Sequence, residues 1–156
     1  MVDINKILFP TDFSETSKKA FKYAVEFANV FNAELEILHI QLDEAQVVAF
    51  YLPESTLRNV KKELEESTKQ QLDDFCNIYR HQLEKVNYYK KILKGIPHVE
   101  IIEEAKETNA DMIIIGTHGR SGFEHVLFGS TTEKVIRKAP CPVLTVSLRG
   151  LELKNK

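Results

Sequence analysis

Residues 112–131 read MIIIGTHGRSGFEHVLFGST, and this stretch joins an apolar run to a loop rich in glycine. The run from Met112 to Ile115 has no polar face, which is typical of a parallel strand covered by helices on both sides. Four of the chain's six glycines follow between Gly116 and Gly129. Glycine in a regular element costs roughly 0.5–1 kcal/mol relative to alanine, so this concentration indicates a loop with a special backbone path.

The rest of the chain alternates short apolar runs with segments of helical periodicity. We expect strands at residues 6–10, 34–40, 88–93, 111–115 and 141–147, and helices at 14–31, 55–83, 97–109 and 131–138. Ser14 is the expected N-cap of the first helix, and residues 42–54 are expected to form a loop. Six residues mark one face of the longest helix: Leu57, Val60, Leu64, Leu72, Phe75 and Tyr79. The alternation predicts an α/β fold, a single domain with an open five-stranded parallel sheet and helices on both faces.

Length and charge restrict the class of protein. The 156 residues fit one domain, which we place at 1–148 with a polar tail at 149–156. A formal net charge of −2 gives no electrostatic footprint for nucleic acid or for an anionic membrane. The cysteines Cys76 and Cys141 form neither a disulfide framework nor a metal-ligand spacing. Since no apolar run has the length of a secretion signal or a membrane span, we expect a cytoplasmic protein.

Ligands of open parallel sheets bind outside the carboxyl ends of the strands, where the strand order reverses. The residues that follow the predicted strands include Pro10-Thr11-Asp12, Ile40-Gln41 and the loop from Gly116. If the first and fourth strands are neighbours, Asp12 and Gly116 face each other across one crevice.

The end of the glycine loop has the features of a phosphate site. Ser130-Thr131-Thr132-Glu133 fits a capping box, with Ser130 as the N-cap and Glu133 three residues later. A helix start offers unpaired N–H groups and a positive dipole end, which suit phosphate. The loop lacks the lysine of a Walker motif, and it does not follow the first strand as a dinucleotide fingerprint does.

Gly116-x-x-Gly119, nine residues and Gly129-Ser130 reproduce the G-2x-G-9x-G-[S/T] motif, and here the chain resembles the ATP-binding branch of the universal stress protein family. Further segments agree with that resemblance: KILFPTDFSE at 6–15, ILHI at 37–40, GIPH at 95–98 and APCPVLTV at 139–146. The likeness covers residues 4–147, apart from the lengths of the 42–54 segment and the long helix.

The resemblance implies strand order 3-2-1-4-5 and a pocket for ATP, ADP or AMP, with Mg²⁺ carried by the phosphates. Pro10, Thr11 and Asp12 would hold the adenine and ribose end, and the backbone of Ile40 would contact the base. Ile115 and Gly116 would flank the ribose. The phosphates would be surrounded by His118, Gly119, Arg120, Gly129, Ser130, Thr131 and Thr132.

The resemblance and the apolar edge strand together suggest a homodimer. The pairing residues would be Val143, Leu144, Thr145 and Val146.

Simpler interpretations remain open for several residues. The glycines could serve only tight turns, Asp12 could only cap the first helix through Asp12-x-x-Glu15, and His118 and Arg120 could be solvated. His39 is expected to be structural.

No residue of the loop is placed as a general base, so we expect a stress-response regulator or switch with at most slow ATP hydrolysis. In it, bound nucleotide would order the loop from Gly116 to Gly129 and so change a surface that an unknown protein partner reads. A nucleotide-free dimeric interaction module is the main alternative. A flavodoxin-like protein lacks its glycine after the first strand, and a phospho-receiver domain lacks an acidic residue before Asp12.

Overall fold

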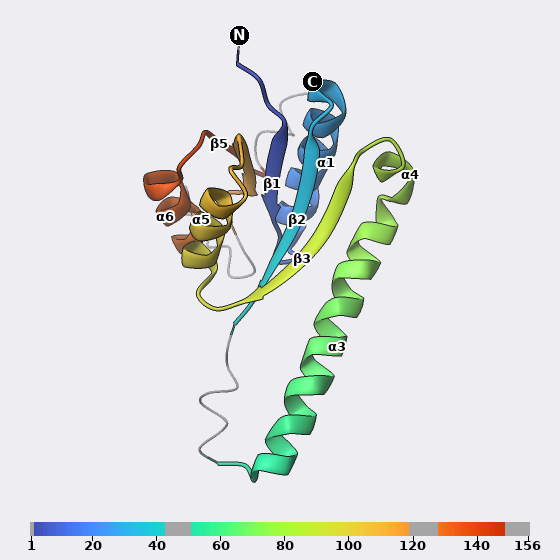
Figure 1. The fold of residues 1–156 in the computed structure, drawn as a ribbon, viewed down its shortest axis with the longest axis vertical. Coiled ribbons are helices and arrows are strands. Elements are labelled where there is room, and N and C mark those ends of the chain that lie inside the picture. The colour runs from blue at the N-terminus through green and yellow to red at the C-terminus, as the bar shows by residue number, and fades with distance from the viewer. Residues whose placement is uncertain (1, 43–50, 119–127, 149–156) are drawn as a thin grey trace.

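The computed structural model describes residues 2–42, 51–118 and 128–148. Figure 1 shows a twisted sheet with helices on its two faces and one helix that extends well beyond it. The strands are β1 (Lys6–Pro10), β2 (Glu34–Gln41), β3 (Tyr88–Lys94), β4 (Met112–Gly116) and β5 (Val143–Val146). The helices are α1 (Glu15–Phe31), α3 (Glu54–Ile78), α4 (Arg80–Leu83), α5 (Pro97–Glu107) and α6 (Ser130–Lys138).

All five strands pair in parallel in the order β3-β2-β1-β4-β5, as predicted. β1 lies between β2 and β4, with Leu8 opposite Glu36 on one side and Ile113 on the other. The order reverses between β1 and β4, so the turn after β1 and the loop after β4 leave the sheet side by side. The predicted α/β fold class is confirmed, and the first and fourth strands are neighbours in the sheet.

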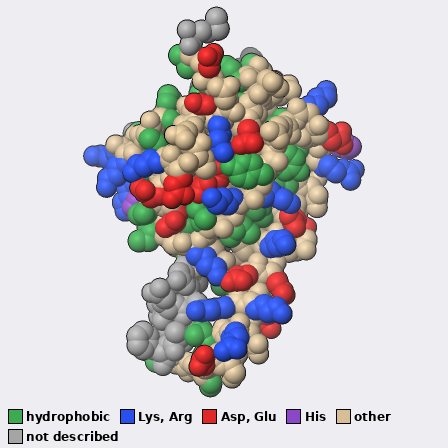
Figure 2. Space-filling model, viewed as in Figure 1, with side chains coloured by type: hydrophobic (Ala, Val, Ile, Leu, Met, Phe, Trp, Pro, Cys, Tyr) green, Lys and Arg blue, Asp and Glu red, His purple; other side chains and the backbone are tan. Residues whose placement is uncertain are grey.

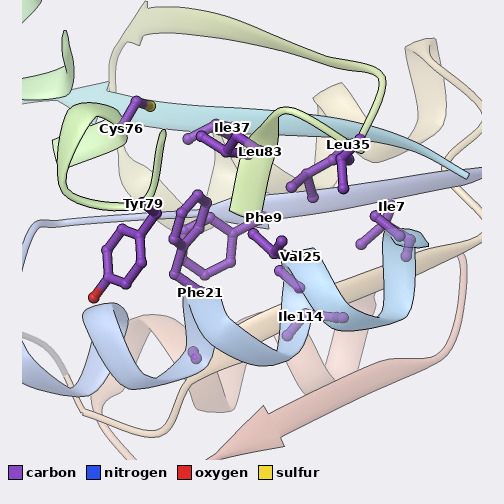
Figure 3. Packing of buried hydrophobic residues seen from close by; sticks show 14 of the residues in the cluster. Ile7, Phe9, Phe21, Val25, Leu35, Ile37, Cys76, Tyr79, Leu83 and Ile114 are labelled. Atoms are coloured by element: carbon purple, nitrogen blue, oxygen red, sulfur yellow. The ribbon is translucent and has the colours of Figure 1, made fainter. Parts of the chain in front are cut away.

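Alternate residues of the strands enter two cores, one on each face of the sheet. On one face, Ile7, Phe9 and Ile37 pack against α1, α3 and α4 (Figure 3). The rings of Phe21 and Phe75 are in contact there at a centroid distance of 4.9 Å. On the other face the strand residues pack against α5 and α6. Two-sided burial explains why the central strands read as continuous apolar runs.

The predicted helix at 55–83 is two helices. α3 ends at Ile78, and the short α4 begins at Arg80 after Tyr79, whose φ of −110° and ψ of 20° depart from helical values. The Tyr79 ring packs against Phe21 at 4.8 Å, so the break places an aromatic side chain in the core. The other predicted elements differ from the observed ones by at most two residues at either end.

The first half of α3 lies beyond the sheet (Figure 1), so the predicted apolar face of this helix is buried only in its second half. Leu72 and Phe75 are buried, whereas Val60 and Leu64 are each 41% exposed. A 25-residue helix is about 38 Å long. The longest strand has eight residues and spans about 26 Å, so the sheet cannot cover the whole helix. Figure 2 shows positive and negative side chains interspersed along this projecting part.

The two ends of α1 explain its sequence. Ser14 is the N-cap, as predicted, and its hydroxyl accepts a hydrogen bond from the Ser17 N–H at 3.2 Å. The helix ends at Asn32, which has φ of 53° and ψ of 39°. Asparagine tolerates this left-handed conformation better than most residues, so it can end the helix without glycine. None of the helices in the described ranges combines the length and apolar character needed to cross a bilayer.

Candidate functional site

A pocket of about 530 Å³ opens at the carboxyl edge of the sheet, over β1, β2 and β4. Its size is within the range of small-molecule sites. Eleven of the thirteen predicted site residues line it: Pro10, Thr11, Asp12, Ile40, Ile115, Gly116, His118, Gly129, Ser130, Thr131 and Thr132. The other two, Gly119 and Arg120, lie outside the described residues. Segments far apart in the sequence therefore meet in one cavity.

The turn after β1 is held by its own hydroxyl and carboxylate groups. Asp12 Oδ1 accepts a hydrogen bond from the Ser14 N–H at 3.0 Å, and Thr11 Oγ1 accepts one from the Phe13 N–H at 3.1 Å. Phe13 has a φ of 64°, which lets the chain reverse into α1. The helix cap is Ser14, so the box from Asp12 to Glu15 does not form. Asp12 fixes the turn and also lines the pocket.

His39 was expected to be structural, and its contacts agree with that expectation. Its Nδ1 lies 2.8 Å from the Thr11 carbonyl oxygen, and its ring stacks on Phe13 at a centroid distance of 4.4 Å. His39 also lines the pocket. The imidazole therefore links β2 to the turn that carries Asp12.

The end of β4 is tied to the start of α6. Thr132 Oγ1 donates a hydrogen bond to the Gly116 carbonyl at 2.8 Å, and the Gly129 N–H donates to the Thr117 carbonyl at 2.7 Å. Both threonines are buried. These bonds hold the first turn of α6 against the strand end, so its N–H groups lie at the wall of the pocket.

Gly116 is needed for close packing as well as for the pocket. A Cβ at this position would lie 2.9 Å from Thr16 Cγ2 and 3.2 Å from the Thr16 backbone carbon. The first turn of α1 thus approaches β4 more closely than any side chain would allow. This packing supports the structural interpretation of Gly116 without removing it from the pocket wall.

The predicted capping box at the start of α6 is wrong. Gly129 is the N-cap, with φ of −68° and ψ of 161°, and Ser130 is already the first helical residue. The first bond of the helix runs from the Glu133 N–H to the Gly129 carbonyl at 3.0 Å. The helix therefore gives no partner to the N–H groups of Ser130, Thr131 and Thr132. Without a capping side chain at Gly129, an external acceptor can reach them.

One wall of the pocket comes from α3, and no pattern in the sequence indicated it. Leu64, Ser67, Thr68 and Gln71 line the cavity at helical spacing i, i+3, i+4 and i+7. Helical periodicity shows that these residues share a face, but it does not show what the face meets. Ser17 was also missed. Gln41 was named among the residues at the strand ends but was given no role, and it lines the pocket.

The described walls carry little charge. Asp12 is the only carboxylate among the described lining residues, and no Lys or Arg is among them. Within the described ranges, no three His, Cys, Asp or Glu side chains are grouped so that they could hold a metal ion. The described part of the wall therefore contains no carboxylate cluster that could cage a metal ion by itself.

A buried carboxyl pair lies away from the pocket, between β2 and α5. Glu36 is fully buried and Glu104 is 2% exposed. The Tyr89 hydroxyl donates to Glu36 Oε2 at 2.6 Å, and Lys91 Nζ contacts both oxygens of Glu104 at 2.7 and 2.8 Å. The pKa of Glu36 is raised from 4.5 to about 7, mainly by burial; the hydrogen bond from Tyr89 opposes this shift and the neighbouring Glu104 contributes to it. Glu36 Oε1 has no hydrogen-bond partner among the described residues, and a proton shared between the two carboxyl groups would give it one.

Known proteins were compared with the whole chain. The model of the universal stress protein family matches residues 3–147. A universal stress protein of Methanocaldococcus jannaschii is 36% identical over 156 aligned residues, which cover 93% of this chain and 96% of the relative. The structure of UspA from Lactobacillus plantarum has a TM-score of 0.79 at 29% identity, covering 94% of this chain and 99% of that one.

Two more distant structures share the fold and hold adenine nucleotides. One is a universal stress protein in complex with cAMP, with a TM-score of 0.63 at 22% identity, covering 93% of this chain and 98% of that one. The other, from Archaeoglobus fulgidus, is in complex with dAMP, with a TM-score of 0.58 at 19% identity, covering 94% and 99%.

Proposed function

The chain belongs to the universal stress protein family, and from that premise we propose that it is an adenine-nucleotide-binding module for ATP, ADP or AMP. The observation that carries this proposal is the convergence of eleven predicted residues on one cavity at the strand-order reversal. Parallel sheets bind nucleotides at this place because the loops there diverge and leave room. Family members that hold cAMP and dAMP support the choice of adenine.

The phosphates would bind at the start of α6. The N–H groups of Ser130, Thr131 and Thr132 precede the first helical bond, and the helix dipole favours an anion there. Hydrogen bonds to a charged group contribute roughly 1.5–3 kcal/mol each. Mg²⁺ would be held by phosphate oxygens and water, since Asp12 is the one described carboxylate at the wall.

The sugar and base would lie farther along the edge. Asp12 can accept hydrogen bonds from ribose hydroxyls, because a carboxylate is purely an acceptor. Ile115 and Gly116 at the end of β4 would flank the ribose, and the backbone of Ile40 would contact the base.

The same walls favour a regulatory role over fast hydrolysis. Fast phosphoryl transfer uses a Lys or Arg beside the transferring group in addition to Mg²⁺, and no Lys or Arg lines the described part of the pocket. A nucleotide held between Gly116 and Gly129 would contact both ends of the intervening segment. We infer that it orders this segment and so changes a surface that a protein partner reads.

The start of α6 provides the decisive test. Ser130→Asp places a carboxylate among the N–H groups that would bind phosphate, yet it favours the helix by about 0.3–1 kcal/mol through the dipole. We expect the variant to fold at least as stably as the wild type and to bind ATP at least tenfold more weakly in a fluorescent ATP titration. The matched control is Ser55→Asp, which is an exposed first-turn residue of α3. Equal ATP affinity of all three proteins, or no binding by the wild type, would refute the proposal.

We also propose a homodimer through β5, the edge strand of the sheet. The carbonyls of Pro142 and Val146 accept bonds from β4, so the backbone groups of Val143 and Thr145 point toward the free edge. These groups can pair with a second copy in antiparallel orientation. An open edge with half-buried apolar residues would otherwise be prone to aggregation.

Thr145→Pro tests the dimer because it removes an N–H that only the free edge uses. We expect wild type and Thr145→Val to sediment as dimers at tens of micromolar and Thr145→Pro to sediment as a folded monomer. A monomeric wild type would refute this interface, and so would a dimer that survives the proline.

A further inference from the structure

Gln41, the last residue of β2, is a buried polar side chain at the pocket wall. It is 9% exposed, and its buried Oε1 has no hydrogen-bond partner among the residues that the structure describes. Buried side-chain oxygens are nearly always paired, so an unpaired one needs an explanation. A rotation about the last bonds of the side chain would turn its amide toward the cavity, where a ligand could supply the missing donor.

The cavity that Gln41 lines also has polar side chains from α3 in its wall. Ser67, Thr68 and Gln71 of α3 line the same cavity, and the Thr68 hydroxyl donates to the Leu64 carbonyl at 2.8 Å. The amides of Gln41 and Gln71 can each donate and accept, and so can the hydroxyl of Ser67. A wall that offers both hydrogen-bond donors and acceptors is suited to a heterocycle that carries donors and acceptors on one edge.

If a nucleotide binds as proposed above, the strand order places Gln41 at the end of the pocket where the base would lie. The assignment of Gln41 therefore rests on the proposed function. The phosphates would bind at α6, next to the end of β4. β1 separates β4 from β2, and neighbouring strands are about 4.8 Å apart, so β2 lies about 10 Å from the phosphate end. A nucleotide whose phosphates lie at α6 would therefore extend along the carboxyl edge toward β2.

We propose that the Gln41 amide reads the base, with its oxygen accepting a hydrogen bond from the 6-amino group of adenine. Glutamine can pair with adenine through two bonds, because the amino group donates while the adjacent ring nitrogen accepts. The backbone of Ile40 cannot be altered by substitution, whereas the side chain of Gln41 can. Gln41 is therefore the residue at which selectivity for the amino group can be measured.

A thermodynamic cycle tests this assignment. The ligands are ATP and purine riboside triphosphate, which lacks only the 6-amino group, and the proteins are wild type and Gln41→Leu. We expect the wild type to prefer ATP about tenfold, equivalent to 1.4 kcal/mol, and Gln41→Leu to bind the two ligands equally. Gln82→Leu on α4 is the matched control, because Gln82 is exposed and is not among the residues that line the cavity. It should keep the wild-type preference.

The remaining outcomes also decide the question. Gln41→Leu removes an unpaired buried oxygen, so the ligand-free variant should melt at or above the wild-type temperature. If ATP binds and Gln41→Leu keeps the wild-type preference, the role of Gln41 is overturned while nucleotide binding stands. If neither ligand binds the wild type, nucleotide binding fails and this inference fails with it.

Discussion

Replacing Glu36 with glutamine should remove a large part of the pH dependence of stability. Glu36 is fully buried, and burial raises its pKa from 4.5 to about 7 in the folded protein. Between these two values the native state holds a proton that the unfolded chain has released. The native protein therefore loses stability as the pH rises from 4.5 to 7, and the whole loss is present above pH 7.

The magnitude follows from the shift. One pKa unit corresponds to about 1.36 kcal/mol, so the shift from 4.5 to about 7 costs about 3.4 kcal/mol at alkaline pH. About 2.5 kcal/mol of this cost develops between pH 5 and pH 8. Glutamine has nearly the same shape, can accept from Tyr89 and can donate to Glu104 without a titrating proton. Lys6 Nζ lies 3.9 Å from a carboxylate oxygen of Glu36 and 3.1 Å from one of Glu34. In the Glu36→Gln variant, Lys6 therefore still has Glu34 as an ion-pair partner.

Urea denaturation at pH 5 and pH 8 gives the free energy of unfolding of the wild type and of Glu36→Gln, and the change between the two pH values is compared. The wild type should lose about 2.5 kcal/mol more than Glu36→Gln between the two pH values. Glu26→Gln, an exposed substitution on α1, is the control and should behave as the wild type does. If Glu36→Gln shows the wild-type pH dependence, the buried carboxyl does not hold the proton.

Three further substitutions test the packing that positions the pocket. Gly116→Ala should lower the free energy of unfolding by about 1–3 kcal/mol in urea denaturation, because the new methyl would lie 2.9 Å from Thr16 Cγ2. Thr132→Val should cost about 1–3 kcal/mol in the same assay, because the buried Gly116 carbonyl loses its donor. Phe21→Ala should cost about 3–5 kcal/mol and lower the melting temperature, because the ring is fully buried between aromatic neighbours. An unfolding free energy equal to that of the wild type would contradict the corresponding contact in each case.

Local sequence patterns determined most elements of the fold. The apolar run before Gly116, the cap at Ser14 and the alternation of strands with helices each depend on neighbouring residues, and each was read correctly. The error at Ser130 was also local. Serine is a common N-cap, but glycine can fill that position too, and the sequence does not show which of the two adjacent residues leaves helical geometry.

The pocket depended on tertiary structure. The sequence identified the strand ends because parallel strands bring their carboxyl ends to one edge. It could not identify the wall from α3, since periodicity shows which residues share a face and not whether the sheet reaches that face. Val60 and Leu64 are four residues apart and Leu72 and Phe75 three, both helical spacings, yet only the second pair is buried. The helix is longer than the strands it covers, and the position at which it crosses the sheet decides which residues are buried and which line the cavity.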